Sequence, residues 1–164
     1  MSVRLLFLWL ALWLAGVPAA RAADDELLLT HSEFAREAAG PWQRVELPDT
    51  WAQRSLAGAG KGFYRLAFHL DAVPERPWAM RIARLSTNHE VRVNGQLVSG
   101  GLPMATPVYR RPMPVLVSLP PALLRAGENR VEIEVDNGMR AGLSPLRLGP
   151  AAQPAKLARA AGVA

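Results

Sequence analysis

Short runs in which apolar and polar residues alternate are the feature that most constrains how this chain can fold. In the segment 130–135, two valines and an isoleucine fall on one face and two glutamates on the other. This period of two is typical of a strand that buries one face. Prolines and glycines interrupt the chain so often that no stretch suits a long amphipathic helix. The pattern therefore favours an all-β fold.

About eight short segments carry this alternation, with turn signals roughly every ten residues. The clearest are residues 63–70, 78–84 and 130–135. Residues 89–93, 96–98, 114–119 and 146–148 are also expected to be strands, and 27–29 and 44–47 are two weaker ones. Asn94-Gly95 predicts a tight hairpin turn, because both residues tolerate positive φ angles. Pro120 to Gly127 predict one helical turn, opened by proline and ended by glycine. Together these signals predict an antiparallel β-sandwich of jelly-roll type.

The first 22 residues have the pattern of a secretory signal peptide. Arg4 precedes an apolar run, and Ala20-Arg21-Ala22 supplies the small residues of a cleavage site. The apolar run, residues 5–17, is shorter than the roughly 20 residues that a membrane-spanning helix needs. We predict cleavage after Ala22, with an uncleaved anchor as the alternative. The sandwich domain is expected at 23–149 in the periplasm or outside the cell, followed by a disordered or frayed tail at 150–164.

Composition excludes several classes of function. The chain has no cysteine, which excludes disulfides, thiolate metal sites and cysteine nucleophiles. The formal charge of +5 falls to +3 when Arg4 and Arg21 leave with the signal peptide. The basic residues are scattered, and Arg110-Arg111 is the one adjacent pair. Nucleic-acid binding is not expected, because neither a basic stripe nor a recognised binding module is present.

Residues capable of catalysis or metal binding are also poorly placed. The three histidines, His31, His69 and His89, lack the spacing of metal ligands, so we expect neither a metal nor another cofactor. No Gly-x-Ser-x-Gly motif occurs. Glu132 and Glu134 share one strand face, which is more typical of a solvated surface than of a glycosidase acid pair. We therefore predict that the chain is not an enzyme.

Five phrases in a fixed order point to a known family of folds. They are LPDTW (47–51), GFYR (62–65), VRVNG (91–95), RPMP (111–114) and PALLRAGEN (121–129). In this order they resemble galactose-binding-like jelly-roll domains. One relative is the sugar-binding domain of family 2 glycoside hydrolases, whose catalytic acids lie in a separate barrel domain.

A closer resemblance is to the N-terminal periplasmic sensor domain of bacterial seven-transmembrane receptors linked to histidine kinase or diguanylate cyclase modules. The resemblance covers about residues 42–149. It implies ligand binding outside the cytoplasm and a membrane signalling protein as partner. Such receptors continue into membrane helices that residues 1–164 do not include. We expect either a free-standing periplasmic protein or a truncated or separately encoded sensor half, and a sensor half would pass its signal to a membrane partner.

Sugar recognition combines an aromatic platform for C–H faces with planar groups that hydrogen-bond hydroxyls. Arginine can also hold a carboxylate or uronate through two parallel hydrogen bonds. Loops at sheet ends commonly carry such groups, and the candidates here are Trp51, Arg54, Asn88, His89, Tyr109, Arg110 and Arg111. Structural roles are the alternative: Trp51 could plug the sandwich edge, and Asn88 could cap a turn. Trp42 and Trp78 are expected in the core.

The sequence thus predicts an exported, non-catalytic ligand-binding module of sensory or carbohydrate-binding type, with a carbohydrate or other small polar ligand. The alternative is a protein-interaction or structural accessory domain of an envelope complex that binds no small molecule. A segment rich in glycine and proline, residues 99–108, would act as a lid or as a plain long loop.

Overall fold

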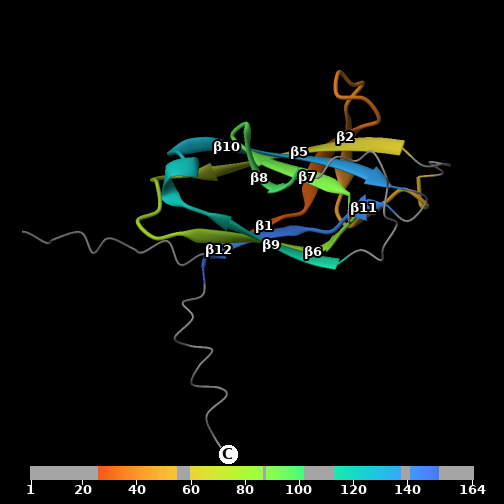
Figure 1. The fold of residues 1–164 in the computed structure, drawn as a ribbon. Helices are drawn as coiled ribbons and strands as arrows, with labels where there is room; N and C mark the ends of the chain where they lie inside the picture. The colour runs from red at the N-terminus through yellow and green to blue at the C-terminus, as the bar shows by residue number, and fades with distance from the viewer. Residues whose placement is uncertain (1–25, 55–59, 87, 102–112, 138–140, 152–164) are drawn as a thin grey trace, which may run out of the picture.

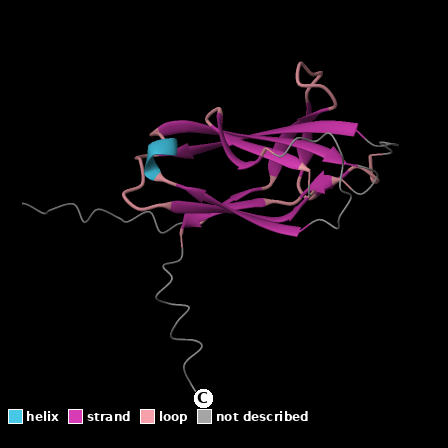
Figure 2. Ribbon diagram, in the orientation of Figure 1, coloured by secondary structure: helices cyan, strands magenta, loops and turns pink. Residues whose placement is uncertain are grey.

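Two antiparallel sheets stack face to face in the computed structural model, which describes residues 26–54, 60–86, 88–101, 113–137 and 141–151. Figure 1 shows the two layers, and Figure 2 shows that strands dominate both. The strands are β1 (Leu27–Leu29), β2 (His31–Ala35), β3 (Gln43–Glu46), β4 (Asp49–Thr50), β5 (Gly60–Leu70), β6 (Trp78–Leu85), β7 (His89–Val93), β8 (Gln96–Gly100), β9 (Met113–Leu119), β10 (Gly127–Asn137), β11 (Gly142–Leu143) and β12 (Leu146–Pro150). The predicted all-β antiparallel sandwich is confirmed, with twelve strands in the described residues against the eight or so expected.

The two layers differ in size. The larger sheet has six strands in the order β3-β2-β5-β10-β7-β8, and the smaller has four in the order β1-β12-β6-β9. Strands β4 and β11 pair with each other as a small third sheet. The loop between β2 and β3, residues 36–42, stands above the outer face of the six-stranded sheet (Figure 1). That outer face is the surface on which the candidate site lies.

The core lies between the sheets and is built by the alternation seen in the sequence. The inward residues of β5, β6 and β10 are all buried, at no more than 6% exposed: Tyr64, Leu66, Phe68, Leu70, Trp78, Met80, Ile82, Val131, Ile133 and Val135. Glu132 and Glu134 face outward, as predicted. Burial of apolar surface supplies the main stabilisation of such a fold. The inward side chains therefore hold the two sheets together, and the outward side chains are not part of this core.

The hairpin prediction is confirmed. Asn94 has φ of 50° and Gly95 has φ of 85°, and Val93 pairs with Gln96 across the turn. Positive φ at both central residues is the requirement of the turn type that matches the twist of the flanking strands. The turn therefore sets the register of β7 against β8.

The helical turn differs from its prediction at its C-terminal end. It is a 3-10 helix (Pro121–Leu123) that begins with proline as expected, but it ends at Leu123, and Leu124 is already extended. Gly127 has φ of 88°, yet it begins β10 rather than ending the helix. The reason is that the buried side chain of Asn129 accepts a hydrogen bond from the backbone N–H of Arg125, which organises the intervening loop.

Several predictions concern residues that the structure does not describe. The predicted signal peptide, residues 1–22, lies outside the described residues, as does the tail from residue 152 on. Strand β12 continues to Pro150, one residue beyond the predicted end of the domain. Within the described ranges, none of the helical segments has the length and apolar character needed to span a membrane.

Candidate functional site

Trp51, the first predicted site residue, lies in the core. Its side chain has no exposed surface, and its indole N–H donates a hydrogen bond to the Tyr64 hydroxyl at 3.0 Å. The Tyr64 hydroxyl in turn donates to a carboxylate oxygen of Asp49 at 2.7 Å. Burial raises the pKa of Tyr64 above its ordinary value, and the charge of Asp49 and its hydrogen bond raise it further. The ring of Trp51 therefore has no free face on which a sugar could stack.

Arg54 belongs to the same cluster. Its guanidinium lies 3.5 Å from the Asp49 carboxylate and donates to the side-chain carbonyl of Gln43 at 3.0 Å. It also stacks 4.3 Å from the ring centre of Phe34. The structure thus brings Trp51 and Arg54 together, but through a shared structural partner, Asp49, rather than around an open cavity.

Asn88 and His89 lie at the start of β7. The backbone carbonyl of Asn88 accepts from the N–H of Asp136. Nδ1 of His89 lies 2.6 Å from the Ser86 carbonyl, and Nε2 lies 3.3 Å from the Ser99 hydroxyl. Both residues are half-buried and positioned by these bonds.

The other three candidates, Tyr109, Arg110 and Arg111, lie outside the described residues, so their roles stay predictions.

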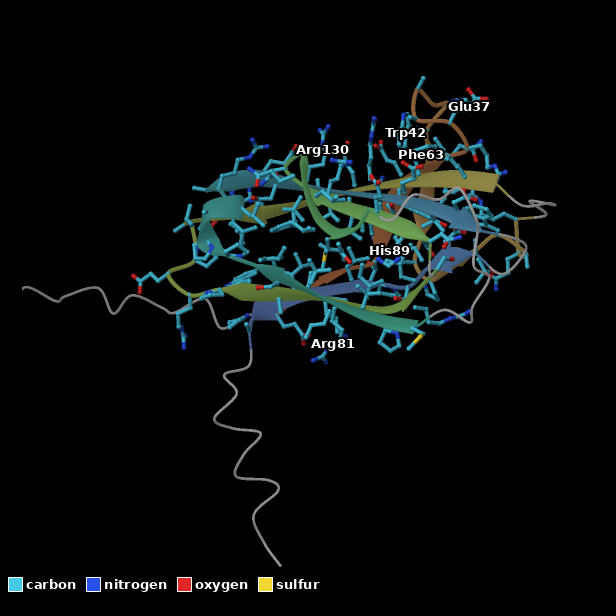
Figure 3. The ribbon with its side chains drawn as sticks, viewed as in Figure 1. Glu37, Trp42, Phe63, Arg81, His89 and Arg130 are labelled. Atoms are coloured by element: carbon cyan, nitrogen blue, oxygen red, sulfur yellow. The ribbon has the colours of Figure 1, made fainter. Side chains whose placement is uncertain are left out.

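A hollow on the outer face of the six-stranded sheet has the better geometry for a ligand. It has a volume of about 190 Å³ and is called the aromatic hollow below. Trp42 and Ala38 of the loop 36–42 form one wall, and Phe63 stands beside them on β5. The floor is formed by outward residues of three adjacent strands: Arg65, Glu132, Glu134, Glu90 and Arg92. Figure 3 shows Trp42 and Phe63 close together on this face, with Arg81 on the opposite face of the molecule.

Strand register assembles the floor from distant parts of the sequence. Glu132 on β10 lies between Arg65 on β5 and Arg92 on β7. Glu134, two residues further along β10, lies between Phe63 and Glu90. Side chains directly opposite each other on one face have Cβ atoms about 5 Å apart. Two parallel rows of charged and aromatic groups therefore cross the centre of the sheet.

The charges of the floor are largely paired. Lys61 donates to Glu134 at 2.6 Å, and Arg92 donates to Glu90 at 2.8 Å. The bond to Glu134 and the charge of that carboxylate raise the pKa of Lys61 above its ordinary value. Pairing holds these side chains in place, while the remaining lone pairs of the carboxylates stay available to accept hydrogen bonds from hydroxyl groups.

Arg65 and Gly40 hold Trp42 in position. The guanidinium carbon of Arg65 lies 3.7 Å from the indole ring centre, a cation–π contact worth roughly 0.5–1 kcal/mol at an exposed site. Gly40 has φ of 96°, and a Cβ atom there would lie 2.9 Å from the indole ring. The loop therefore approaches Trp42 too closely for a side chain at this position.

Trp42 is half-buried on the outer face, so the expectation that it belongs to the core is wrong. Trp78 is a core residue, as expected.

A second and larger hollow adjoins the first on the same face. It has a volume of about 500 Å³ and is called the basic hollow below. Its lining comes from β2, β3, β5 and β10 and includes His31, Glu33, Arg44, Arg65, Ala67, Glu128 and Arg130. Arg65 lines both hollows, which makes them neighbours along the sheet.

The chemistry of this face is that of polar ligand recognition. An indole and a phenyl ring offer apolar surface to C–H groups, while carboxylates and guanidiniums offer acceptors and donors in fixed planes. Among the described residues, no group of three or more histidine, aspartate or glutamate side chains is arranged to hold a metal ion.

Sequence reasoning missed this site because it placed binding groups on loops at the strand ends. The available signal was the row of outward residues on the strands themselves.

No protein-family model and no curated protein matches the sequence, but solved structures share the fold. A family 2 β-galacturonidase from Eisenbergiella tayi bound to galacturonate matches with a TM-score of 0.61 and 15% identity, over 78% of this chain and 25% of that one. A β-glucuronidase from Ruminococcus gnavus matches with a TM-score of 0.60 and 12% identity, over 76% and 29%. A glycosyl hydrolase family 2 member from Bacteroides cellulosilyticus matches with a TM-score of 0.59 and 19% identity, over 76% and 20%.

The chain spans about a quarter of the length of these enzymes. At these identities the likeness establishes the fold. It agrees with the resemblance of the sequence to the sugar-binding domain of family 2 glycoside hydrolases. None of these three structures supports the resemblance to sensor receptors. The structure is therefore that of a β-sandwich similar to one part of larger sugar-processing enzymes.

Proposed function

We propose that this chain is a non-catalytic carbohydrate-binding domain that binds a sugar in the aromatic hollow. The observation that carries the proposal is the position of Trp42 and Phe63 beside a floor of paired carboxylates and guanidiniums. The aromatic rings take the apolar face of the sugar, and the floor takes its hydroxyl groups. The similarity to enzymes described as a β-galacturonidase and a β-glucuronidase adds support, because those proteins act on sugars.

The position of the two floor carboxylates of β10 supports a role in binding rather than in cleavage. A glycosidase needs two carboxyl groups on opposite sides of the scissile bond. Glu132 and Glu134 project from the same face of β10, and cations lie beside both: Lys61 at 2.6 Å from Glu134 and Arg65 at 3.7 Å from Glu132. In the proposed function these groups accept hydrogen bonds from hydroxyls and perform no proton transfer.

Export to the periplasm or the medium and coupling to a membrane signalling protein form part of the proposal only as predictions from the sequence. The sensory role rests on the resemblance to receptor domains. A binding domain attached to or acting beside a sugar-processing enzyme needs no such coupling. An N-terminus at Ala23 in the exported protein, measured by mass spectrometry, would support export with cleavage; one at Met1 would exclude cleavage.

Binding can be tested through tryptophan fluorescence. Trp51 and Trp78 are buried at 0% and 3% exposed, while Trp42 lies at the hollow. We expect saccharides of a neutral and acidic panel, titrated into the purified protein, to change the emission of Trp42. Replacing Trp42 by alanine should lower the affinity at least about thirtyfold, the loss typical of a central aromatic anchor. Trp42→Phe should retain most of the affinity and abolish the emission change.

The matched control is Leu116→Ala, which removes an exposed apolar side chain from the opposite sheet. It should leave saccharide affinity unchanged. Calorimetry that detects no saccharide binding across the panel would overturn the proposed function. Binding that is unaffected by Trp42→Ala would place the sugar elsewhere on the molecule. A protein that binds no saccharide but recovers one stable envelope partner would support the alternative interaction domain.

A further inference from the structure

We infer that the site continues from the aromatic hollow into the basic hollow and that its ligand is an acidic oligosaccharide. In this arrangement an apolar sugar face packs on Trp42 and Phe63, and the carboxylate of a neighbouring uronate residue binds in the basic hollow, which Arg44 and Arg130 line. The inference rests on the proposed function, because it assumes that the outer face binds sugars. It adds the charge of the ligand and its extent.

The two hollows differ in charge. In the aromatic hollow, three carboxylates face two guanidiniums, and the nearby Lys61 binds one of the carboxylates. In the basic hollow, the guanidiniums of Arg44, Arg130 and the shared Arg65 face two carboxylates, those of Glu33 and Glu128. A ligand that presents an apolar sugar face at one end and a carboxylate at the other is complementary to this distribution.

The guanidiniums of the basic hollow are also less fully bonded than the charges of the aromatic hollow. In the part of the chain that the structure describes, Arg44 makes no ion pair, and Arg130 lies 3.6 Å from an exposed Glu128 carboxylate. By contrast, the aromatic hollow contains pairs at 2.6 Å and 2.8 Å. An exposed guanidinium without a close carboxylate partner can bind an anionic group of a ligand.

The two hollows adjoin each other at Arg65 on β5. Arg65 lines both of them, with Phe63 on one side and Ala67 on the other. At the rise of a strand, the four residue steps from Phe63 to Ala67 span about 13 Å, which is longer than one sugar ring. Ala67 lies opposite Arg130 in the register, and its small side chain keeps the basic hollow open. Figure 3 shows Arg130 on the same outer face as Trp42 and Phe63.

Arginine suits the proposed contact because its planar fork binds a carboxylate through two parallel hydrogen bonds. Arg44 and Arg130 are exposed, so salt should screen their attraction for the ligand. An acidic sugar should therefore bind more tightly at low ionic strength. A neutral sugar of the same shape should show little salt dependence.

The test uses two disaccharides of the same linkage, α-1,4-digalacturonate and α-1,4-galactobiose. The first carries carboxylates at the positions where the second carries hydroxymethyl groups. In calorimetry at about 50 mM salt, we expect digalacturonate to bind at least about tenfold more tightly, and the difference to shrink at about 500 mM. The double variant Arg44→Gln, Arg130→Gln should bind the two disaccharides with similar affinity. Its affinity for digalacturonate should fall more than its affinity for galactobiose.

The control is Arg81→Gln, Arg147→Gln, which removes the same charge from the outer face of the four-stranded sheet. It should retain the preference for digalacturonate. Equal binding of both disaccharides, still lost in Trp42→Ala, would overturn the acidic preference and leave the proposed function standing. A preference that survives in the Arg44 and Arg130 double variant would also overturn the inference. Absence of binding for both disaccharides and for the wider panel would overturn the inference and the proposed function together.

Discussion

Tyr64 has two roles that follow from its position on β5. Its ring packs in the core, tilted against Phe34 with ring centres 5.0 Å apart, and its hydroxyl connects Trp51 to Asp49. Asp49 is buried at 6% exposed, so its carboxylate depends on these partners in place of water. The chain from Trp51 through Tyr64 to Asp49 therefore joins β4 to the six-stranded sheet.

Removing the hydroxyl alone tests that connection. We expect Tyr64→Phe to lower the free energy of unfolding by about 1–3 kcal/mol, because the Asp49 carboxylate and the Trp51 N–H both lose a buried partner. Urea-induced unfolding followed by circular dichroism measures the change. The control Ser118→Ala removes an exposed hydroxyl from β9 and should change stability by less than about 0.5 kcal/mol. Equal stability of Tyr64→Phe and the parent would contradict the role given to this hydroxyl.

The raised pKa of Tyr64 also predicts alkaline instability. In the unfolded chain tyrosine loses its proton near pH 10, whereas folded Tyr64 keeps it because its pKa is raised. Below pH 10 both states are protonated, and the contribution to stability is constant. Above pH 10 the unfolded state binds fewer protons, so the free energy of unfolding falls by up to about 1.4 kcal/mol per pH unit. Unfolding curves at pH 9 to 11 should show this extra fall in the parent and not in Tyr64→Phe.

Two asparagines connect elements that the sequence places far apart. Asn129, fully buried at the start of β10, accepts hydrogen bonds from the Arg125 N–H and the Asn94 side chain and donates to the carbonyl of Arg125. Asn94, in the hairpin turn, donates to the Leu123 carbonyl and accepts from the Arg130 N–H. The β7–β8 turn and the loop before β10 are thereby fixed to each other.

Asn129→Ala should be among the more damaging polar substitutions. It leaves two donors and at least one carbonyl without partners in a buried position, and we expect a loss of about 2–3 kcal/mol. Thermal and urea unfolding measure it. Asn129→Asp keeps the acceptor and loses the amide donors, so it should fall between the parent and the alanine variant. A stability order that does not follow the number of bonds lost would refute this account.

The elements that could be predicted from the sequence are those whose burial follows a regular period. β5, β6 and β10 bury every second residue, so alternation alone indicated them. β2 escaped prediction because its inward face combines Phe34 with the polar Ser32, which is buried at 4% exposed. The Ser32 hydroxyl donates to the Arg65 carbonyl at 3.0 Å, a partner that only the tertiary structure supplies. β4 and β11 have two residues each and are too short to show any period.

At the scale of the whole molecule, the candidate site could not be predicted because it depends on lateral strand order. Phe63, Glu90 and Glu134 are neighbours only because β10 lies between β5 and β7. Local sequence specifies which side chains point outward, but it does not specify which strands are adjacent. The resemblance to known jelly rolls gave the architecture. It did not give the location of a ligand. Trp51 bonds to Tyr64 in the core, and Arg54 pairs with Asp49.

The sandwich should depend strongly on its central strand. Ile133 is 1% exposed on β10, between β5 and β7. We expect Ile133→Asp to unfold the domain, because it places an unpaired charge in the core. Loss of the β-type circular dichroism spectrum would show this. The control Ala67→Asp adds the same charge at an exposed position on the neighbouring strand and should leave the fold intact. A folded Ile133→Asp protein would contradict the placement of Ile133 in the core between the two sheets.

The placement of the hollows on the exterior of regular strands has a consequence for protein engineering. Positions 63, 65, 90, 92, 132 and 134 face outward on three adjacent strands, while their sequence neighbours form the interior. A combinatorial library confined to these six codons would therefore vary ligand selectivity on a scaffold whose core residues between the sheets are untouched. Because the main stabilisation comes from that core, most members of such a library should remain folded and could be screened directly for new saccharide preferences.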